Sequence, residues 1–202
     1  MIQALKKPVG FDEFLEWYPE NSEVRYELRR GVIVEMPKPR GKHSDVAGFL
    51  TIEAGILIQQ LKAEYFIPKE CVVRADKGES AYEPDGIILD RREIANEPNW
   101  EKSSAIENGT TIKLIIEVVS TNWRDDYYVK FAAYEALGIR EYWIVDYAAL
   151  GGRRFLDNPK QPVLWVCELS EGEYQMTPFR ENDHIISPTF PDLQLTAAQI
   201  FQ

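Results

Sequence analysis

The segment from residue 112 to residue 146 constrains the fold more than any other part of the chain. An apolar run at 112–119 is followed by a helical pattern at about 125–137 and by a second apolar run, EYWIVD. Gly138, just past the helical pattern, is the residue type that ends many helices. A strand, a helix and a strand in this order predict a right-handed crossover between two parallel strands. The expected class is therefore α/β, with a mixed β-sheet flanked by helices.

A carboxylate stands near the carboxyl end of the first of these strands. Glu117 lies within the apolar run LIIEVVS. Burying an unpaired charge costs several kcal/mol or shifts the pKa until the group is neutral. The sequence therefore predicts that Glu117 has a partner or a chemical role.

The rest of the chain supplies further strands and helices. Alternating apolar and polar residues around a glycine in VRYELRRGVIVEM predict a β-hairpin. Apolar residues at helical spacing from His43 to about Leu61 predict the first long helix. The other expected elements are a short helix at 11–17, strands in YFIPKECVVRA and EPDGIILD, a helical turn and loop at 91–110, strands in PVLWVCEL and EYQMTPF, and a closing helix in LTAAQIF.

Composition and length suit a protein with a full hydrophobic core. The chain has 202 residues, of which 45% are hydrophobic and 12% aromatic. We expect one domain over residues 1–202, with an N-terminal hairpin and helix at 23–62, core motifs at 82–147, and C-terminal strands and a helix at 150–202. Without a signal-peptide pattern or a membrane-spanning apolar run, the expected location is the cytoplasm. Cys71 and Cys167 are expected to be buried thiols.

The charge distribution sets limits on the partners of the chain. A net charge of −10 opposes strong nonspecific binding to nucleic acid, because phosphate contacts need lysine and arginine. Basic residues are nevertheless concentrated between residues 29 and 42, a stretch that contains Lys38 and Arg40. This stretch is either an ordinary solvated turn or a phosphate-binding edge. In the second case, Arg40 is a candidate substrate-binding residue.

A second carboxylate stands at one end of another apolar strand. Asp85 begins the run DGIILD, and it can converge with Glu117 if the two strands are neighbours. Paired carboxylate oxygens suit a hard divalent cation, Mg²⁺ or Mn²⁺. Such a cation can polarise a phosphoryl oxygen and lower the pKa of an attacking water.

A lysine on the following helix is a candidate for stabilising charge on phosphate. Lys130 follows Glu117 on a helix that folds back over the same sheet. Asp126 precedes Lys130 by four positions, so the alternative is an exposed salt bridge on the helix surface. Tyr134, Tyr142 and Trp143 are expected to pack in the core.

The segments EPDGIILD, LIIEVVS and RDDYYVKFAAYEALGIREYWIVDY together resemble the PD-(D/E)xK nuclease superfamily, and within it the Uma-type family of bacterial restriction endonucleases. The resemblance implies a restriction-endonuclease-like fold, with a metal bound by Asp85, Glu117 and the backbone carbonyl of Val118. The lysine that the superfamily places two positions after the glutamate is replaced by Val119. In related families a lysine from the following helix takes that place, which implies a catalytic role for Lys130.

The resemblance also extends to the N-terminal hairpin. It makes Glu27 a candidate catalytic acid that positions metal-bound water, and the alternative is a hairpin carboxylate that faces solvent or pairs with Arg29. His43, at the start of the long helix, either contacts phosphate or has no chemical role. Trp123 and Arg124, in the loop after Glu117, are candidate substrate contacts.

These observations lead to three functional hypotheses. The first is a metal-dependent DNA endonuclease that forms a homodimer, so that two sites address two strands. The second is a catalytically inactive relative that serves as a binding or assembly module, a hypothesis supported by Val119 and the acidic charge. The third is a hydrolase of another phosphate ester.

Overall fold

The computed structural model describes residues 7–20 and 22–202, which form two β-sheets with helices packed against them. In this part of the chain the larger sheet has six strands, in the order β11 (Glu173–Phe179), β10 (Val163–Ser170), β9 (Glu141–Asp146), β8 (Ile112–Val118), β6 (Gly86–Asp90) and β3 (Tyr65–Phe66). The smaller sheet has five in the described residues, in the order β2 (Val32–Met36), β1 (Arg25–Arg29), β5 (Ser80–Tyr82), β4 (Val72–Ala75) and β7 (Ala105–Ile106). The predicted α/β class is confirmed, but there are two mixed sheets instead of one.

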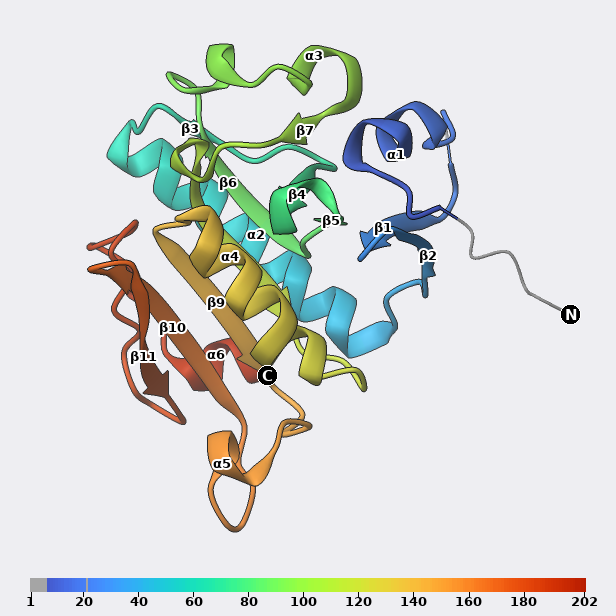
Figure 1. The fold of residues 1–202 in the computed structure, drawn as a ribbon. Coiled ribbons are helices and arrows are strands. Elements are labelled where there is room, and N and C mark those ends of the chain that lie inside the picture. Colours follow the sequence, from blue (N-terminus) through green and yellow to red (C-terminus); the bar gives the residue numbers. More distant parts are fainter. Residues whose placement is uncertain (1–6, 21) are drawn as a thin grey trace, which may run out of the picture.

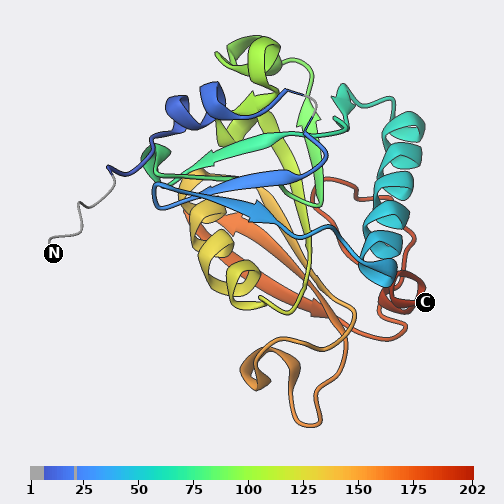
Figure 2. The same ribbon diagram turned by 90° about the vertical axis from the view of Figure 1, so that its right-hand side faces the viewer.

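Helices cover both faces of the larger sheet. The α-helices are α1 (Phe11–Trp17), α2 (Gly41–Leu61), α3 (Trp100–Ser103), α4 (Phe131–Leu137), α5 (Arg153–Leu156) and α6 (Ala197–Phe201). Short 3₁₀ turns lie at η1 (Asp76–Gly78), η2 (Ile94–Asn96) and η3 (Gly109–Thr111), and a π-helix, η4 (Asp125–Lys130), leads into α4. Figures 1 and 2 show α2 and α4 on opposite faces of the larger sheet. None of the helices in the described ranges is long and apolar enough to span a membrane.

Alternation along β8 and β9 creates a core on each face of the larger sheet. Ile115 and Ile144 belong to the cluster that includes residues of α4, whereas Ile116 and Val145 belong to the cluster that includes residues of α2. Successive side chains of a strand point to opposite faces, so a strand covered on both sides carries a nearly continuous apolar run. Glu117 has the same parity as Ile115 and therefore points toward the face that carries η4 and α4.

The predicted crossover is present. β8 and β9 pair in parallel, with Glu117 opposite Ile144. The helix between them ends at Gly138, whose φ of 80° lies in the left-handed region that glycine adopts without strain. The predicted single helix at about 125–137 differs at its start, because its first six residues form a π-helix before α4 begins.

Two other predictions are corrected. YFIPKECVVRA was expected to be one strand, but it divides into β3 of the larger sheet and β4 of the smaller one, with Pro68 in the connection. Proline has no N–H to donate, so it interrupts strand pairing. The loop expected at 91–110 contains β7, which pairs in parallel with β4. A strand of two residues is too short to show an alternating pattern.

The two sheets meet at Asp85. The chain leaves β5 of the smaller sheet at Tyr82 and enters β6 of the larger sheet at Gly86, so the residues between them join the sheets. β6 pairs antiparallel with β8, and Gly86 lies opposite Ile116. In an antiparallel pair the preceding residue of one strand faces the following residue of the other, which brings Asp85 beside Glu117.

Candidate active site

A buried ion pair joins β8 to the π-helix. Lys130 Nζ donates a hydrogen bond to Glu117 Oε1 over 2.8 Å, and Tyr134 Oη donates to the same oxygen over 2.8 Å. The Lys130 and Glu117 side chains are only 6% and 3% exposed. The alternative of an exposed salt bridge between Lys130 and Asp126 is therefore wrong. The partner that the sequence required for Glu117 is Lys130.

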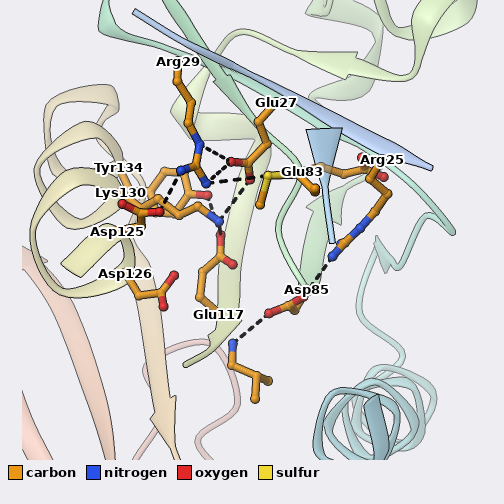
Figure 3. A network of polar contacts seen from close by, with 12 residues as sticks. Arg25, Glu27, Arg29, Glu83, Asp85, Glu117, Asp125, Asp126, Lys130 and Tyr134 are labelled. Carbon is orange, nitrogen blue, oxygen red and sulfur yellow. Dashed lines mark hydrogen bonds and ion pairs between the residues drawn. The ribbon is translucent and has the colours of Figure 1, made fainter. Parts of the chain in front are cut away.

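Glu27 holds the same lysine from the smaller sheet. Its Oε1 lies 3.2 Å from Lys130 Nζ, and its Oε2 accepts hydrogen bonds from Nε and Nη2 of Arg29 over 3.0 and 2.8 Å. Arg29 also donates from Nη1 to Asp125 Oδ2 over 2.8 Å, so it ties β1 to the π-helix. Figure 3 shows this network converging on Glu27 and Lys130. Glu27 is buried, so the alternative of a hairpin carboxylate that faces solvent is wrong, whereas its pairing with Arg29 is present.

Asp85 lies on the other side of Glu117 and has its own partners. Its Oδ2 accepts a hydrogen bond from the backbone N–H of Val118 over 3.0 Å and lies 3.3 Å from His43 Nε2. Arg25 Nη2 lies 3.6 Å from Oδ1. The start of α2 thus brings His43 against a predicted metal ligand, where it can orient the carboxylate.

The charges of the site perturb one another. Burial raises the pKa of Glu117, and although Lys130 lowers it, the net result is a pKa of about 7. Burial alone would lower the pKa of the Lys130 ammonium, but the carboxylates of Glu117 and Glu27 raise it above its usual value. Burial likewise opposes ionisation of Asp85, yet His43 and Lys130 hold its pKa below the usual range. At neutral pH the site therefore holds a charged lysine and an ionised Asp85.

Asp126 is a further buried carboxyl group at this site. Its residue is 6% exposed, and its side chain makes no hydrogen bond or ion pair with the residues that the structure describes. Burial raises the pKa of this carboxyl group well above its usual value, and the nearby Glu117 adds to the rise. In Figure 3 the Asp126 carboxylate points toward the Glu117 side chain. In place of the alternative, an exposed salt bridge with Lys130, Asp126 presents a carboxyl group that lines the pocket.

A pocket of about 410 Å³ opens over these groups. One wall is the connection between β2 and α2, which contributes Met36, Pro37, Lys38, Pro39 and Arg40. Further lining residues follow β8 and β9, namely Val119, Ser120, Thr121, Asn122, Tyr147 and Leu150. Of the four residues predicted to bind substrate, His43 and Arg40 line this pocket.

Trp123 and Arg124 do not line this pocket in the described part of the chain, which corrects their expected position over the site. The Arg124 guanidinium lies 4.4 Å from the centre of the Trp123 ring, and that ring packs edge to face with Tyr127. The first residues of the loop, Ser120 to Asn122, line the pocket, and Trp123 then packs against Tyr127 and Tyr128 of the π-helix. Loop direction is set by this packing, which the local sequence does not reveal.

The donor set at the centre of the site fits a hard divalent cation. The hydrogen bond from Val118 N to Asp85 Oδ2 holds that carboxylate next to Glu117 and Val118, and all three line the pocket. These residues offer oxygen atoms only, as Mg²⁺ and Mn²⁺ prefer. Glu117 uses Oε1 for Lys130 and Tyr134, which leaves Oε2 for another ligand. Within residues 7–20 and 22–202, no three histidine, cysteine, aspartate or glutamate side chains are grouped as metal ligands, so a cation here would rely on two carboxylates.

Sequence reasoning missed two contributors to the site. Tyr134 was assigned to core packing, but its hydroxyl group also contacts Glu117. Arg25 was assigned no role, although it lies beside Asp85. The spacing of Tyr134, four residues after Lys130 and thus on the same helix face, was the available signal for the first. No local signal pointed to Arg25, because its contact joins β1 to the connection between the two sheets, sixty residues further along the chain.

Comparison with known proteins places the chain in a family. The model of the Uma2 family, described as "Putative restriction endonuclease", matches residues 11–198. Among solved structures, the chain resembles the crystal structure of "a putative nuclease belonging to DUF820 from Anabaena variabilis ATCC 29413". The two share 21% identity and a TM-score of 0.65, over 96% of this chain and 98% of that one. A search of curated proteins gave no match. The fold is thus restriction-endonuclease-like, and the chain belongs to the Uma2 family.

Proposed function

We propose that this chain is a metal-dependent endonuclease that hydrolyses phosphodiester bonds in DNA. The observation that carries the proposal is the buried contact of 2.8 Å between Lys130 Nζ and Glu117 Oε1. Both residues share their pocket with Asp85. A cation site beside a fixed ammonium group suits phosphate chemistry, because negative charge develops on the phosphoryl oxygens. The match to a family described as restriction endonucleases supports the same activity.

Asp85, Glu117 and the backbone carbonyl of Val118 would hold the metal, Mg²⁺ or Mn²⁺. When bound, such a cation polarises a phosphoryl oxygen and lowers the pKa of an attacking water. The contributions of the protein are to fix the two carboxylates and to exclude bulk water. The hydrogen bond from Val118 N holds Asp85, and the contacts from Lys130 and Tyr134 hold Glu117.

Lys130 takes the role of the lysine that the superfamily places at the position of Val119. An ammonium group has three N–H donors. Two of them serve Glu117 Oε1 and Glu27 Oε1, at 2.8 and 3.2 Å. The third is left to donate to a phosphoryl oxygen of the substrate and to stabilise its developing charge.

Glu27 acts as a positioning residue in this proposal. Its two carboxylate oxygens contact Lys130 and Arg29, so it holds the lysine in place instead of positioning water. Arg29 in turn fixes Glu27 and reaches Asp125 on the π-helix. The smaller sheet therefore orients the side chain of Lys130, which belongs to the π-helix.

The test is nicking of supercoiled plasmid DNA with Mg²⁺ or Mn²⁺, using the wild type and the Asp85→Asn and Lys130→Met variants. Glu173→Gln, at an exposed position of β11, is the matched control. Cleavage by the wild type and the control, with loss in both site variants, is the expected result. Cleavage of a small phosphodiester but not of DNA would favour a hydrolase of another phosphate ester. Metal binding without cleavage of either substrate would favour an inactive binding module.

We also propose that the chain forms a two-fold homodimer, in which two sites can address two strands. The net charge of −10 supports this, because a dimer would combine the basic residues of both copies along one groove. Small-angle scattering at working concentration tests it. A mass near twice the 23.3 kDa of the chain is expected, and a monomeric mass would contradict it.

A further inference from the structure

The reacting groups lie deep in the pocket. The side chains of Asp85, Glu117 and Lys130 are 10%, 3% and 6% exposed. The pocket above them, at about 410 Å³, is at the lower end of the range of about 300–1,000 Å³ that holds one small ligand. A space of this size holds about one nucleotide, and a nucleotide that enters it brings its phosphodiester against these groups.

A second pocket adjoins the first. Its volume is about 740 Å³, and it lies between the hairpin, the start of β6 and the segment at 67–71. The residues that line both pockets include Arg25, Lys38, Asp85 and the buried Glu83. A DNA strand with one nucleotide in each pocket would therefore place the phosphate between those nucleotides next to Asp85, with the cations Arg25 and Lys38 beside it. Figure 3 shows Arg25 directed at Asp85.

The chemistry of the walls suits bases as well as phosphates. Lys38 and Arg40 lie in the exposed connection before α2, where they can neutralise phosphates. Met36, Tyr147 and Leu150 give the first pocket apolar surface, and Ile67 and Pro68 do so in the second. A paired and stacked base does not offer its faces to such walls, whereas an unpaired base does. Proteins that bind single strands combine a basic groove with apolar and aromatic contacts of this kind.

We propose that the site acts on unpaired DNA: a single strand, a flap, a frayed end or a transiently unpaired stretch of supercoiled plasmid lies across the two pockets, and its scissile phosphate stands at their junction beside Asp85. The inference rests on the proposed function and narrows its substrate. The overall charge agrees with it. A net charge of −10 disfavours the many phosphate contacts that a duplex requires, while one strand needs only the few cations at the junction.

The test compares three labelled DNAs of one sequence: a single strand, a blunt duplex, and a duplex with an unpaired flap. Binding to the wild-type protein is measured by fluorescence anisotropy, first without added metal, and cleavage of the same DNAs is measured with Mn²⁺. The expected result is at least tenfold tighter binding of the single strand than of the duplex, with cleavage confined to the single strand and the flap. Tyr147→Leu keeps the wall apolar but removes its ring, and it should weaken binding of the single strand by about fivefold or more.

The outcomes separate this inference from the proposed function. Equal or better binding and cleavage of the blunt duplex would overturn the inference and leave the endonuclease activity standing. Preferential binding of the single strand without cleavage of any DNA would support the inference and overturn the activity. Absence of binding to all three DNAs, with no cleavage, would overturn both.

Discussion

Replacing Lys130 by methionine should destabilise the protein strongly, because it removes the cation between two buried carboxylates. Lys130 Nζ lies 2.8 Å from Glu117 Oε1 and 3.2 Å from Glu27 Oε1. At an effective dielectric constant of about 20, the closer pair alone is worth about 6 kcal/mol. That value is an upper limit, because Glu117 can take up a proton when the lysine is absent. We expect a loss of about 3–5 kcal/mol in the free energy of unfolding at about pH 8.

The loss of unfolding free energy caused by Lys130→Met should increase as the pH rises. The pKa of Glu117 is about 7 in the folded protein, against about 4.3 for an unperturbed glutamate. The folded state therefore binds more protons between these values, and the contribution of Glu117 to stability falls as the pH rises through this window. Without Lys130 the folded pKa rises further, so the variant continues to lose about 1.4 kcal/mol per pH unit above pH 7, where the wild type levels off. The difference in unfolding free energy between the wild type and Lys130→Met should be about 2 kcal/mol larger at about pH 8.5 than at about pH 6.

Urea unfolding followed by tryptophan fluorescence at these two pH values measures both effects. Lys69→Met is the control, because the Lys69 side chain is 90% exposed and its removal should leave stability unchanged. A loss below about 1 kcal/mol in Lys130→Met, or an equal loss at both pH values, would show that Lys130 does not compensate the buried carboxylates.

Three further predictions concern other parts of the structure. Arg29→Met should lower the rate of plasmid nicking by about tenfold or more, because Glu27, the carboxylate that contacts Lys130, loses its second partner. Hydrogen bonds from Arg92 hold the pKa of Asp90 below its usual range, so the Asp90 carboxylate stabilises the fold above about pH 4 and this contribution is lost as the pH falls toward the folded pKa. In urea titrations, Asp90→Asn should therefore lose about 1.5–3 kcal/mol of unfolding free energy at neutral pH and become as stable as the wild type in acid. Gly109→Ala would place a Cβ 2.1 Å from the carbonyl oxygen of Leu137 and should lower the melting temperature, whereas Gly48→Ala, with open space around it on α2, should leave it unchanged or raise it.

The elements that the sequence predicted well are those with long local patterns. The crossover from β8 to β9 combines two apolar strands with a helical pattern and a glycine stop, so all local signals agree. The same patterns place Asp85 and Glu117 at the ends of neighbouring strands. Their approach could be predicted because antiparallel pairing of β6 and β8 fixes it.

The remaining features depend on contacts between distant parts of the chain. The smaller sheet contains strands of two and three residues, which have no readable period. The π-helix has no local signature that separates it from the α-helix that follows. The contact between Lys130 and Glu27 exists because the smaller sheet packs over the π-helix, and it could not be inferred from spacing along the sequence.

Asp85 and Glu117 are proposed to hold a divalent cation in a site that cleaves DNA. The most direct measurement is calorimetric titration of Mg²⁺ and Mn²⁺ into the wild type and an Asp85→Ala, Glu117→Ala double variant, followed by plasmid nicking with the same samples. We expect the wild type to bind metal and nick the plasmid, and the double variant to lose both. Nicking that persists in a pure preparation of the double variant would contradict it.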